Sequence, residues 1–262
     1  MHIHRYGHGP AAYVGIHGWG GSHATFEPLA SHVPPFASLF AVDLPGYGWS
    51  PPPPSWSAAS VGEAIAEAIH GLEVHSVTLI GNCSGAIFAL LAASHLRPRP
   101  VRLVLIDPFA FVPWYFRVFV HPVFGRPAYY TTFANPLGRW LTNISLKRRR
   151  TEGSDLTRSF AGVDHEVSLR YLQMLQAMHD IDQFSDVCAH VDILYGERTF
   201  AAVKQSLLSW VAVWPEARLI RMDGAGHLPI VEVPLQLAST VFRKTQARPH
   251  GDAPGESRWM TS

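Results

Sequence analysis

The amino-acid sequence predicts an α/β fold in which a mostly parallel central sheet is flanked by helices. Short apolar runs alternate with stretches of helical periodicity along the 262 residues, and this alternation is typical of such folds. The runs are continuously apolar, which suits strands that are covered on both faces. Hydrophobic residues make up 47% of the chain and charged residues 16%, so there is ample material for one large buried core.

Six apolar runs are expected to form the strands, at residues 11–18, 38–46, 76–82, 101–108, 191–197 and 217–224. Helices are expected between them. Ser60 and Glu63 have the spacing of a capping box, and the apolar residues behind them recur at helical spacing (Val61, Ile65, Ile69 and Leu72). A second helix should start at Ser84, and a third should cover residues 231–244 and close the domain.

Residues 109–188 interrupt this alternation. The segment is rich in aromatic residues and lies between two predicted strands, so we expect a helical cap, or lid, inserted after the strand that ends at Asp107. Residues 1–108 and 189–245 should form the core beneath it. The polar tail 246–262 contains proline and glycine and is expected to be disordered.

Composition argues against several classes of partner. A formal net charge of +1 does not favour nucleic acid, and no apolar run has the length that spans a membrane. Without a secretory signal, a cytoplasmic location is expected. The two cysteines, Cys83 and Cys188, lack metal-binding spacing, and Cys188 is expected to be buried and structural. The fifteen histidines look scattered, so we expect no metal and no cofactor.

The stretch "IGNCSGAI" at residues 80–87 has the spacing of a nucleophile elbow, G-x-S-x-G, with Cys83 in place of the serine. In such an elbow a strand ends, the chain turns sharply and a helix begins directly after the nucleophile. Small residues are needed two positions before and after it, and Gly81 and Gly85 supply them. The same pattern could also be a purely structural turn, so other motifs in the chain are needed to distinguish a catalytic elbow from a structural one.

Three further stretches accompany the elbow: "HGWGG" at 17–21, "DLPGYGWS" at 43–50 and "GHLPIVEVP" at 226–234. Together with "GNCSG" they make residues 11–245 resemble the α/β-hydrolase superfamily, and most closely its cap-bearing carboxylesterase branch, which includes the pimeloyl-ACP methyl ester esterases. The resemblance implies that His227 is the general base. It also implies that the backbone N–H groups of Trp19 and Ser84 hold the developing oxyanion.

Cysteine is an unusual nucleophile for this superfamily, although dienelactone hydrolases and polyester synthases use one. A helix N-terminus and a neighbouring imidazole both favour the thiolate form of Cys83. Attack by a thiolate on a thioester replaces one carbon–sulfur bond by another and is nearly balanced in energy. Attack on an alkyl ester is energetically uphill, because the alkoxide is a poorer leaving group. The chemistry therefore favours thioesters or activated esters, and it leaves a reactive acyl-thioenzyme.

The acid of the triad also departs from the family pattern. The family places an aspartate where this chain has Thr199, after Gly196, Glu197 and Arg198. Asp107, at the end of an earlier strand, is the expected substitute, as in some haloalkane dehalogenases. Glu197 is the alternative, and a cysteine site could also function without an acid.

The basic run Lys147, Arg148, Arg149 and Arg150 can be a solvated surface or a dock for an anionic thioester carrier, either coenzyme A or an acyl carrier protein. Three functions remain open. The first is an esterase or thioesterase with a Cys83–His227–Asp107 triad, and the second is an acyltransferase with the same triad. The third is a non-catalytic ligand-binding protein. The sequence does not define the acyl group or the oligomeric state.

Overall fold

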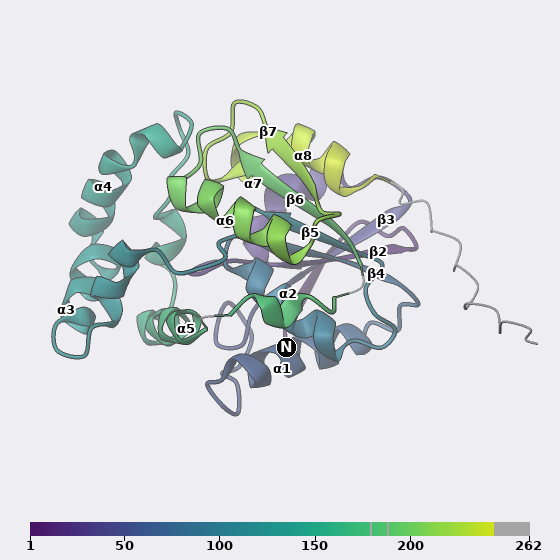
Figure 1. Cartoon of the computed structure of the whole chain (residues 1–262), viewed down its shortest axis with the longest axis horizontal. Coiled ribbons are helices and arrows are strands. Elements are labelled where there is room, and N and C mark those ends of the chain that lie inside the picture. The colour runs from purple at the N-terminus through teal and green to yellow at the C-terminus, as the bar shows by residue number, and fades with distance from the viewer. Residues whose placement is uncertain (179, 188, 244–262) are drawn as a thin grey trace, which may run out of the picture.

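The computed structural model describes residues 1–178, 180–187 and 189–243, and these residues form a seven-stranded sheet between layers of helices (Figure 1). In chain order the strands are β1 (Ile3–Tyr6), β2 (Ala11–Ile16), β3 (Ala37–Val42), β4 (Val77–Asn82), β5 (Arg102–Ile106), β6 (His190–Gly196) and β7 (Arg218–Met222). Their spatial order is β1-β3-β2-β4-β5-β6-β7, and only the β1–β3 pair is antiparallel. The predicted α/β fold is therefore confirmed.

Parallel pairing determines where a site can form. The six parallel strands all end at the same edge of the sheet, so the loops that follow them meet there. The register pairs Gly81 of β4 with Leu105 of β5, and Ile106 of β5 with Leu194 of β6. Residues that directly follow these three strands are consequently neighbours in space.

Helices cover both faces of the sheet. On one face lie α1 (Ala58–His70), α2 (Gly85–His95) and α6 (Ala201–Val213), and on the other lie η1 (His23–His32), α7 (Pro229–Glu232) and α8 (Pro234–Val241). In Figure 1, α1 lies below the sheet and α8 lies above it. Nothing in the sequence analysis predicted β1, η1 or α6.

Two predicted helix boundaries are wrong. The N-cap of α1 is Ser57, which has the extended backbone that a cap needs and accepts a hydrogen bond from the backbone N–H of Ser60 at 3.2 Å. Ser60 therefore lies inside the helix. The predicted helix over 231–244 is interrupted by the extended residue Val233, so that α7 and α8 are separate.

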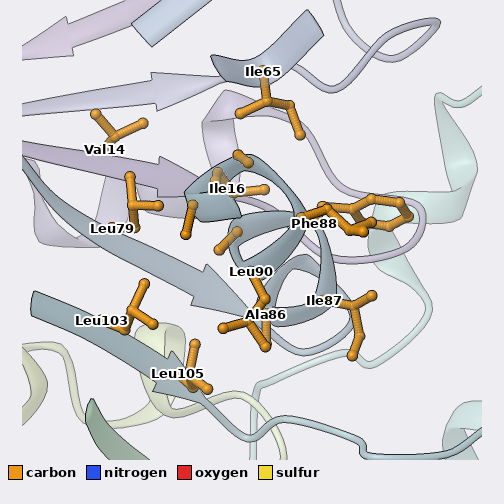
Figure 2. Packing of buried hydrophobic residues seen from close by; sticks show 14 of the residues in the cluster. Val14, Ile16, Ile65, Leu79, Ala86, Ile87, Phe88, Leu90, Leu103 and Leu105 are labelled. Carbon is orange, nitrogen blue, oxygen red and sulfur yellow. The ribbon is translucent and has the colours of Figure 1, made fainter. Parts of the chain in front are cut away.

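The largest core cluster lies between the sheet and the helices α1, α2 and α6. Figure 2 shows Leu79, Leu103 and Leu105 of the strands facing Ala86 and Leu90 of α2. All nine residues from Gly85 to Ala93 are buried, because α2 sits in the middle of this layer. Because α2 is packed on all sides, the turn that precedes it is held in a fixed position.

The chain leaves the sheet after β5 and returns at β6, and the segment between them is helical. Its elements are η2 (Trp114–Val120), α3 (Gly125–Tyr129), η3 (Tyr130–Ala134), α4 (Pro136–Ser145), η4 (Lys147–Arg149), η5 (Arg158–Ala161), α5 (His165–Ala177) and η6 (Asp182–Phe184). A small aromatic core holds it together, with Tyr129, Phe133 and Phe160 buried. Figure 1 shows α3 and α4 beyond the ends of the strands, which is where the predicted cap would have to lie.

Within the described residues no helix is long and apolar enough to cross a bilayer. The predictions for Cys188 and for the tail 246–262 concern residues outside the described ranges.

Candidate active site

Cys83 occupies a sharp turn between β4 and α2. Its φ of 54° lies in the left-handed region, and its backbone N–H donates to the Ile106 carbonyl at 2.8 Å. A Cβ at Gly81 would lie 2.4 Å from the Cα of Ala86, and one at Gly85 would lie 2.3 Å from the Ile16 carbonyl oxygen. Only glycine fits at either position, so the strand–turn–helix predicted from "GNCSG" is present. A strained backbone at a nucleophile position is typical of active sites.

His227 lies in the loop between β7 and α7, beside Cys83. Its Nδ1 atom is 2.5 Å from Oδ2 of Asp107, which leaves Nε2 to face the thiol. Burial disfavours the charged imidazole, but hydrogen bonds with Asp107 and Cys83 outweigh burial and raise the pKa of His227 to about 10. A positive charge next to Cys83 is therefore maintained at neutral pH.

Asp107 follows β5 with a φ of 51° and is fully buried. Its Oδ1 accepts the Gly196 backbone N–H at 2.9 Å, and its Oδ2 accepts the Thr199 hydroxyl as well as the imidazole. The hydroxyl oxygen of Thr199 also lies 3.4 Å from Nδ1 of His227. Thr199 therefore supports the Asp107 carboxylate.

Glu197, the alternative acid, points elsewhere. Glu197 is exposed, and its carboxylate accepts the Gly224 backbone N–H at 2.9 Å. No hydrogen bond joins it to His227 among the described residues. The geometry therefore favours Asp107.

The two backbone groups expected to form the oxyanion hole are adjacent, but one of them is already engaged. The Trp19 N–H donates to the Ser84 hydroxyl at 2.8 Å. The Ser84 side chain makes no capping bond to α2, so its hydroxyl is directed at Trp19 instead of the helix. An oxyanion would have to compete with this hydroxyl for the Trp19 N–H.

His17 holds the loop that carries Trp19, a role that the sequence analysis missed. Its Nε2 accepts the Leu44 N–H at 3.0 Å, so Nδ1 carries the proton and donates to the Gly18 carbonyl at 2.8 Å. Complete burial lowers the pKa of His17 to about 4, which keeps the ring neutral. Its position in "HGWGG" was the available signal.

Phe109 and Phe200 enclose the imidazole, and these residues were also missed. Their ring centroids lie 5.5 and 4.7 Å from that of His227, both nearly edge to face. They come from the segments after β5 and β6, and both belong to apolar stretches in which no sequence signal distinguishes them. Their contacts keep water away from the imidazole.

A cavity of about 600 Å³ opens above Cys83 and His227. A cavity of this size accommodates a small ligand or an acyl chain. Its walls are mostly apolar and come from α2 and the helices between β5 and β6; they include Ile87, Phe116, Phe133, Phe160, Leu175 and Phe184. Arg149 is the one arginine or lysine among its lining residues.

The four residues of the basic run differ in their contacts and exposure. Arg149 donates to the Thr199 carbonyl at 3.0 Å, and Arg150 donates to the Ser154 carbonyl at 2.5 Å. Lys147 and Arg148 are exposed instead. Two of the four cations therefore bind backbone carbonyls, and two remain available to solvent.

The described residues place no group of three potential metal ligands at this site. One such group, of histidines, lies elsewhere and is treated below.

Comparison with known proteins agrees with this fold. Residues 14–240 match the model of the alpha/beta hydrolase family. The chain is 26% identical to the pimeloyl-[acyl-carrier protein] methyl ester esterase of Xylella fastidiosa (92% of this chain, 97% of that one). It is 27% identical to the enzyme of the same name from Xanthomonas campestris pv. campestris (95% and 100%).

Solved structures show the same fold at lower identity. An esterase from Thermogutta terrifontis superposes with a TM-score of 0.73 at 16% identity, over 92% of this chain and 90% of that one. The enol-lactonase of Burkholderia xenovorans gives 0.72 at 16% identity, over 92% and 94%. The family match extends over most of the chain and includes the elbow and the histidine loop, so this protein belongs to the alpha/beta hydrolase family.

Proposed function

We propose that the protein is an acyl hydrolase that cleaves a thioester or an activated ester through an acyl-thioenzyme on Cys83. The observation that carries the proposal is the Cys83–His227–Asp107 arrangement at the base of an apolar cavity. The family membership and the names of the relatives support an esterase-like hydrolase.

In the first half of the reaction the Cys83 sulfur attacks the carbonyl carbon of the substrate. The carbonyl oxygen becomes an oxyanion, which the backbone N–H groups of Trp19 and Ser84 would bind once the Ser84 hydroxyl yields. The intermediate then collapses, the bond to the leaving group breaks, and the imidazolium of His227 gives that group its proton. Acylated Cys83 and a free thiol or alcohol result.

In the second half, neutral His227 takes a proton from water, and the hydroxide attacks the acyl carbon. The carbon–sulfur bond breaks, the carboxylic acid leaves, and the thiolate–imidazolium pair is restored. Asp107 keeps the imidazole oriented and stabilises its charge in both halves.

The substrate class follows from the cavity and the exposed cations. Apolar walls fit an acyl chain, and Lys147 and Arg148 lie next to Arg149, which lines the cavity. A positive surface there suits an anionic carrier, and the two relatives are named for an acyl-carrier-protein substrate. We therefore place an acyl carrier protein or coenzyme A ahead of a free ester.

Intact-mass spectrometry tests the proposal. The full chain is incubated with a panel of acyl-CoA thioesters, acyl-carrier thioesters and a pimeloyl methyl ester, and the mass added to the protein identifies the acyl group. Cys83→Ala should form no adduct, whereas Cys188→Ala, the matched control, should form it as the wild type does. Cys83→Ser should retain slow ester hydrolysis, because the oxyanion donors remain.

The same experiment separates the alternatives. An adduct that water discharges supports the hydrolase, while an adduct that persists until an alcohol, amine or thiol is added indicates an acyltransferase. Binding of acyl ligands with no adduct and no turnover would leave only the non-catalytic reading, and full activity of Cys83→Ala would overturn the proposed mechanism.

A further inference from the structure

Three histidines that look scattered in the sequence converge at the β1 edge of the sheet. They are His2, His4 in β1 and His23 at the start of η1. Each offers one ring nitrogen, and these three nitrogens lie within 4.8 Å of one another. The rings of His2 and His4 have centroids 5.1 and 5.2 Å from that of His23.

Strand pairing produces this convergence. β1 runs antiparallel to β3 and pairs Ile3 with Val42, so the start of β1 lies at the end of β3. Residues two apart on a strand point to the same face, which places His2 and His4 together. The His2 carbonyl accepts the Asp43 N–H at 3.1 Å and fixes the register at this point.

Asp43 orients the third histidine. Its buried carboxylate accepts the His23 backbone N–H at 2.6 Å, and it lies 2.9 Å from Nδ1 of the same residue. The Nε2 atom of His23 is thereby left for another partner. Histidines that bind metals commonly donate their other ring N–H to a carboxylate in this way, because the contact fixes the ring and makes the free nitrogen a better ligand.

His2 supplies a second, independent observation. Its Nε2 atom is buried and has no hydrogen-bond partner among the described residues. An unsatisfied buried nitrogen is costly, and a cation bound to it would remove that cost. Ring packing against Trp49, whose centroid is 4.6 Å from that of His2, explains the placement of the ring but leaves the nitrogen without a partner.

We propose that His2, His4 and His23 form a binding site for one late first-row divalent metal ion, Zn²⁺ in the first instance. Three neutral imidazoles suit zinc, nickel or copper and do not suit magnesium or calcium. Three protein ligands leave a fourth position for water. Zinc–nitrogen bonds of 2.0–2.1 Å require the nitrogens to be about 3.4 Å apart in a tetrahedral site, so the half-buried rings close slightly on the ion.

A bound ion would join two parts of the chain that meet here. His2 and His4 belong to the first strand, and His23 follows the loop that carries Trp19. The ion would therefore fasten β1 to that loop and stabilise the folded chain.

The test is a metal titration of the untagged full chain in the Cys83→Ala background, because a thiolate beside His227 could bind zinc by itself. Co²⁺ reports geometry through its visible absorption, and Zn²⁺ binding is measured by calorimetry. We expect one equivalent to bind, with a spectrum of low coordination number and no sulfur-to-metal charge-transfer band. Zinc at a hundredfold excess over Kd should raise Tm by about 5 °C.

Substitutions locate the site. His4→Gln and His23→Gln should each weaken binding at least tenfold, while His75→Gln, an exposed histidine outside the group, should bind as the parent does. Thermal unfolding without metal shows that each variant is folded. The proposal fails if no saturable binding occurs below about 1 mM, or if His75→Gln weakens binding as much as the other two.

Discussion

At the scale of single residues, the Ser84 hydroxyl has the most direct consequence for catalysis. It accepts the Trp19 N–H at 2.8 Å, and that N–H is one of the two proposed oxyanion donors. A hydrogen bond of this kind contributes about 1 kcal/mol, which the oxyanion must overcome. Ser84→Ala should therefore raise kcat/KM about fivefold.

The Ser84→Ala variant should lower Tm by no more than about 4 °C, because it loses the hydrogen bond from Trp19 but no capping bond to α2. Steady-state kinetics and thermal unfolding together measure both effects. A fall in kcat/KM with no larger loss of Tm would mean that the hydroxyl itself donates to the oxyanion.

The charge on His227 should affect how fast Cys83 reacts with an alkylating agent. Burial opposes that charge, but hydrogen bonds with Asp107 and Cys83 raise the pKa of His227 to about 10, so the imidazolium persists below that pH. Because a cation beside a thiol favours the thiolate, iodoacetamide should alkylate Cys83 in the wild type at least tenfold faster at pH 7 than it does in the His227→Ala variant.

Peptide mapping of the alkylated chain measures this rate for Cys83 alone. Asp107→Asn removes the charged partner that helps to raise the pKa of His227, so its Cys83 alkylation rate should lie between those of the wild type and His227→Ala. Equal rates in the wild type and His227→Ala would contradict the ion-pair interpretation.

At the scale of elements, a buried arginine joins the strands and helices on one side of the sheet. Arg102 in β5 is fully buried and donates to Asp192 in β6 at 2.7 Å and to the carbonyls of Val241 and Thr240 at the end of α8. Asp192→Asn removes the only negative charge bonded to it among the described residues. Breaking such a pair costs about 3–5 kcal/mol, so Tm should fall by roughly 10 °C.

The matched control is the exposed pair of Arg221 and Asp223, whose atoms are 2.7 Å apart. Solvent screens this pair, so Asp223→Asn should change Tm by less than about 2 °C. Differential scanning calorimetry measures both variants. Equal losses in the two would show that burial of the Arg102 pair has no special importance.

The elements also show what sequence patterns can and cannot predict. The six apolar runs became strands because strands covered on both faces must be continuously apolar. β1 was missed because it is a short edge strand, IHRY, which is only partly buried and lacks that pattern. The elbow and the histidine loop were recognised from glycine spacing, which reflects local backbone constraints.

Features that depend on distant contacts were not predictable in the same way. The hydrogen bond from Trp19 to Ser84 joins residues 65 apart, and the histidine group depends on the antiparallel pairing of β1. Asp107 was proposed from its place at a strand end, but its support by Gly196 and Thr199 comes from the neighbouring strand β6 and the turn after it. The spacing of residues along the chain does not predict such contacts.

At the scale of the whole molecule, one carboxylate fastens the segment between β5 and β6 to the loop of the proposed base. Glu232 accepts the Thr151 N–H at 2.6 Å and the Ser154 hydroxyl at 2.8 Å through Oε1. Through Oε2 it accepts the backbone N–H of Gly226, next to His227, at 2.6 Å. The His227 N–H itself donates to the Arg149 carbonyl at 2.8 Å. The two parts therefore hold each other in position.

Glu232→Gln should break the hydrogen bonds accepted by one of the two carboxylate oxygens, because an amide nitrogen cannot accept a hydrogen bond from an N–H group. If the contact positions His227, kcat should fall about tenfold, a loss of about 1.4 kcal/mol, with little change in KM, at temperatures where the variant remains folded. Glu152→Gln, on an exposed neighbour in the same segment, is the matched control and should behave as the wild type. An unchanged kcat together with a lower Tm would mean that Glu232 only stabilises the fold. A rise in KM alone would mean that it shapes the cavity, since positioning of the base affects the chemical step whereas cavity shape affects binding.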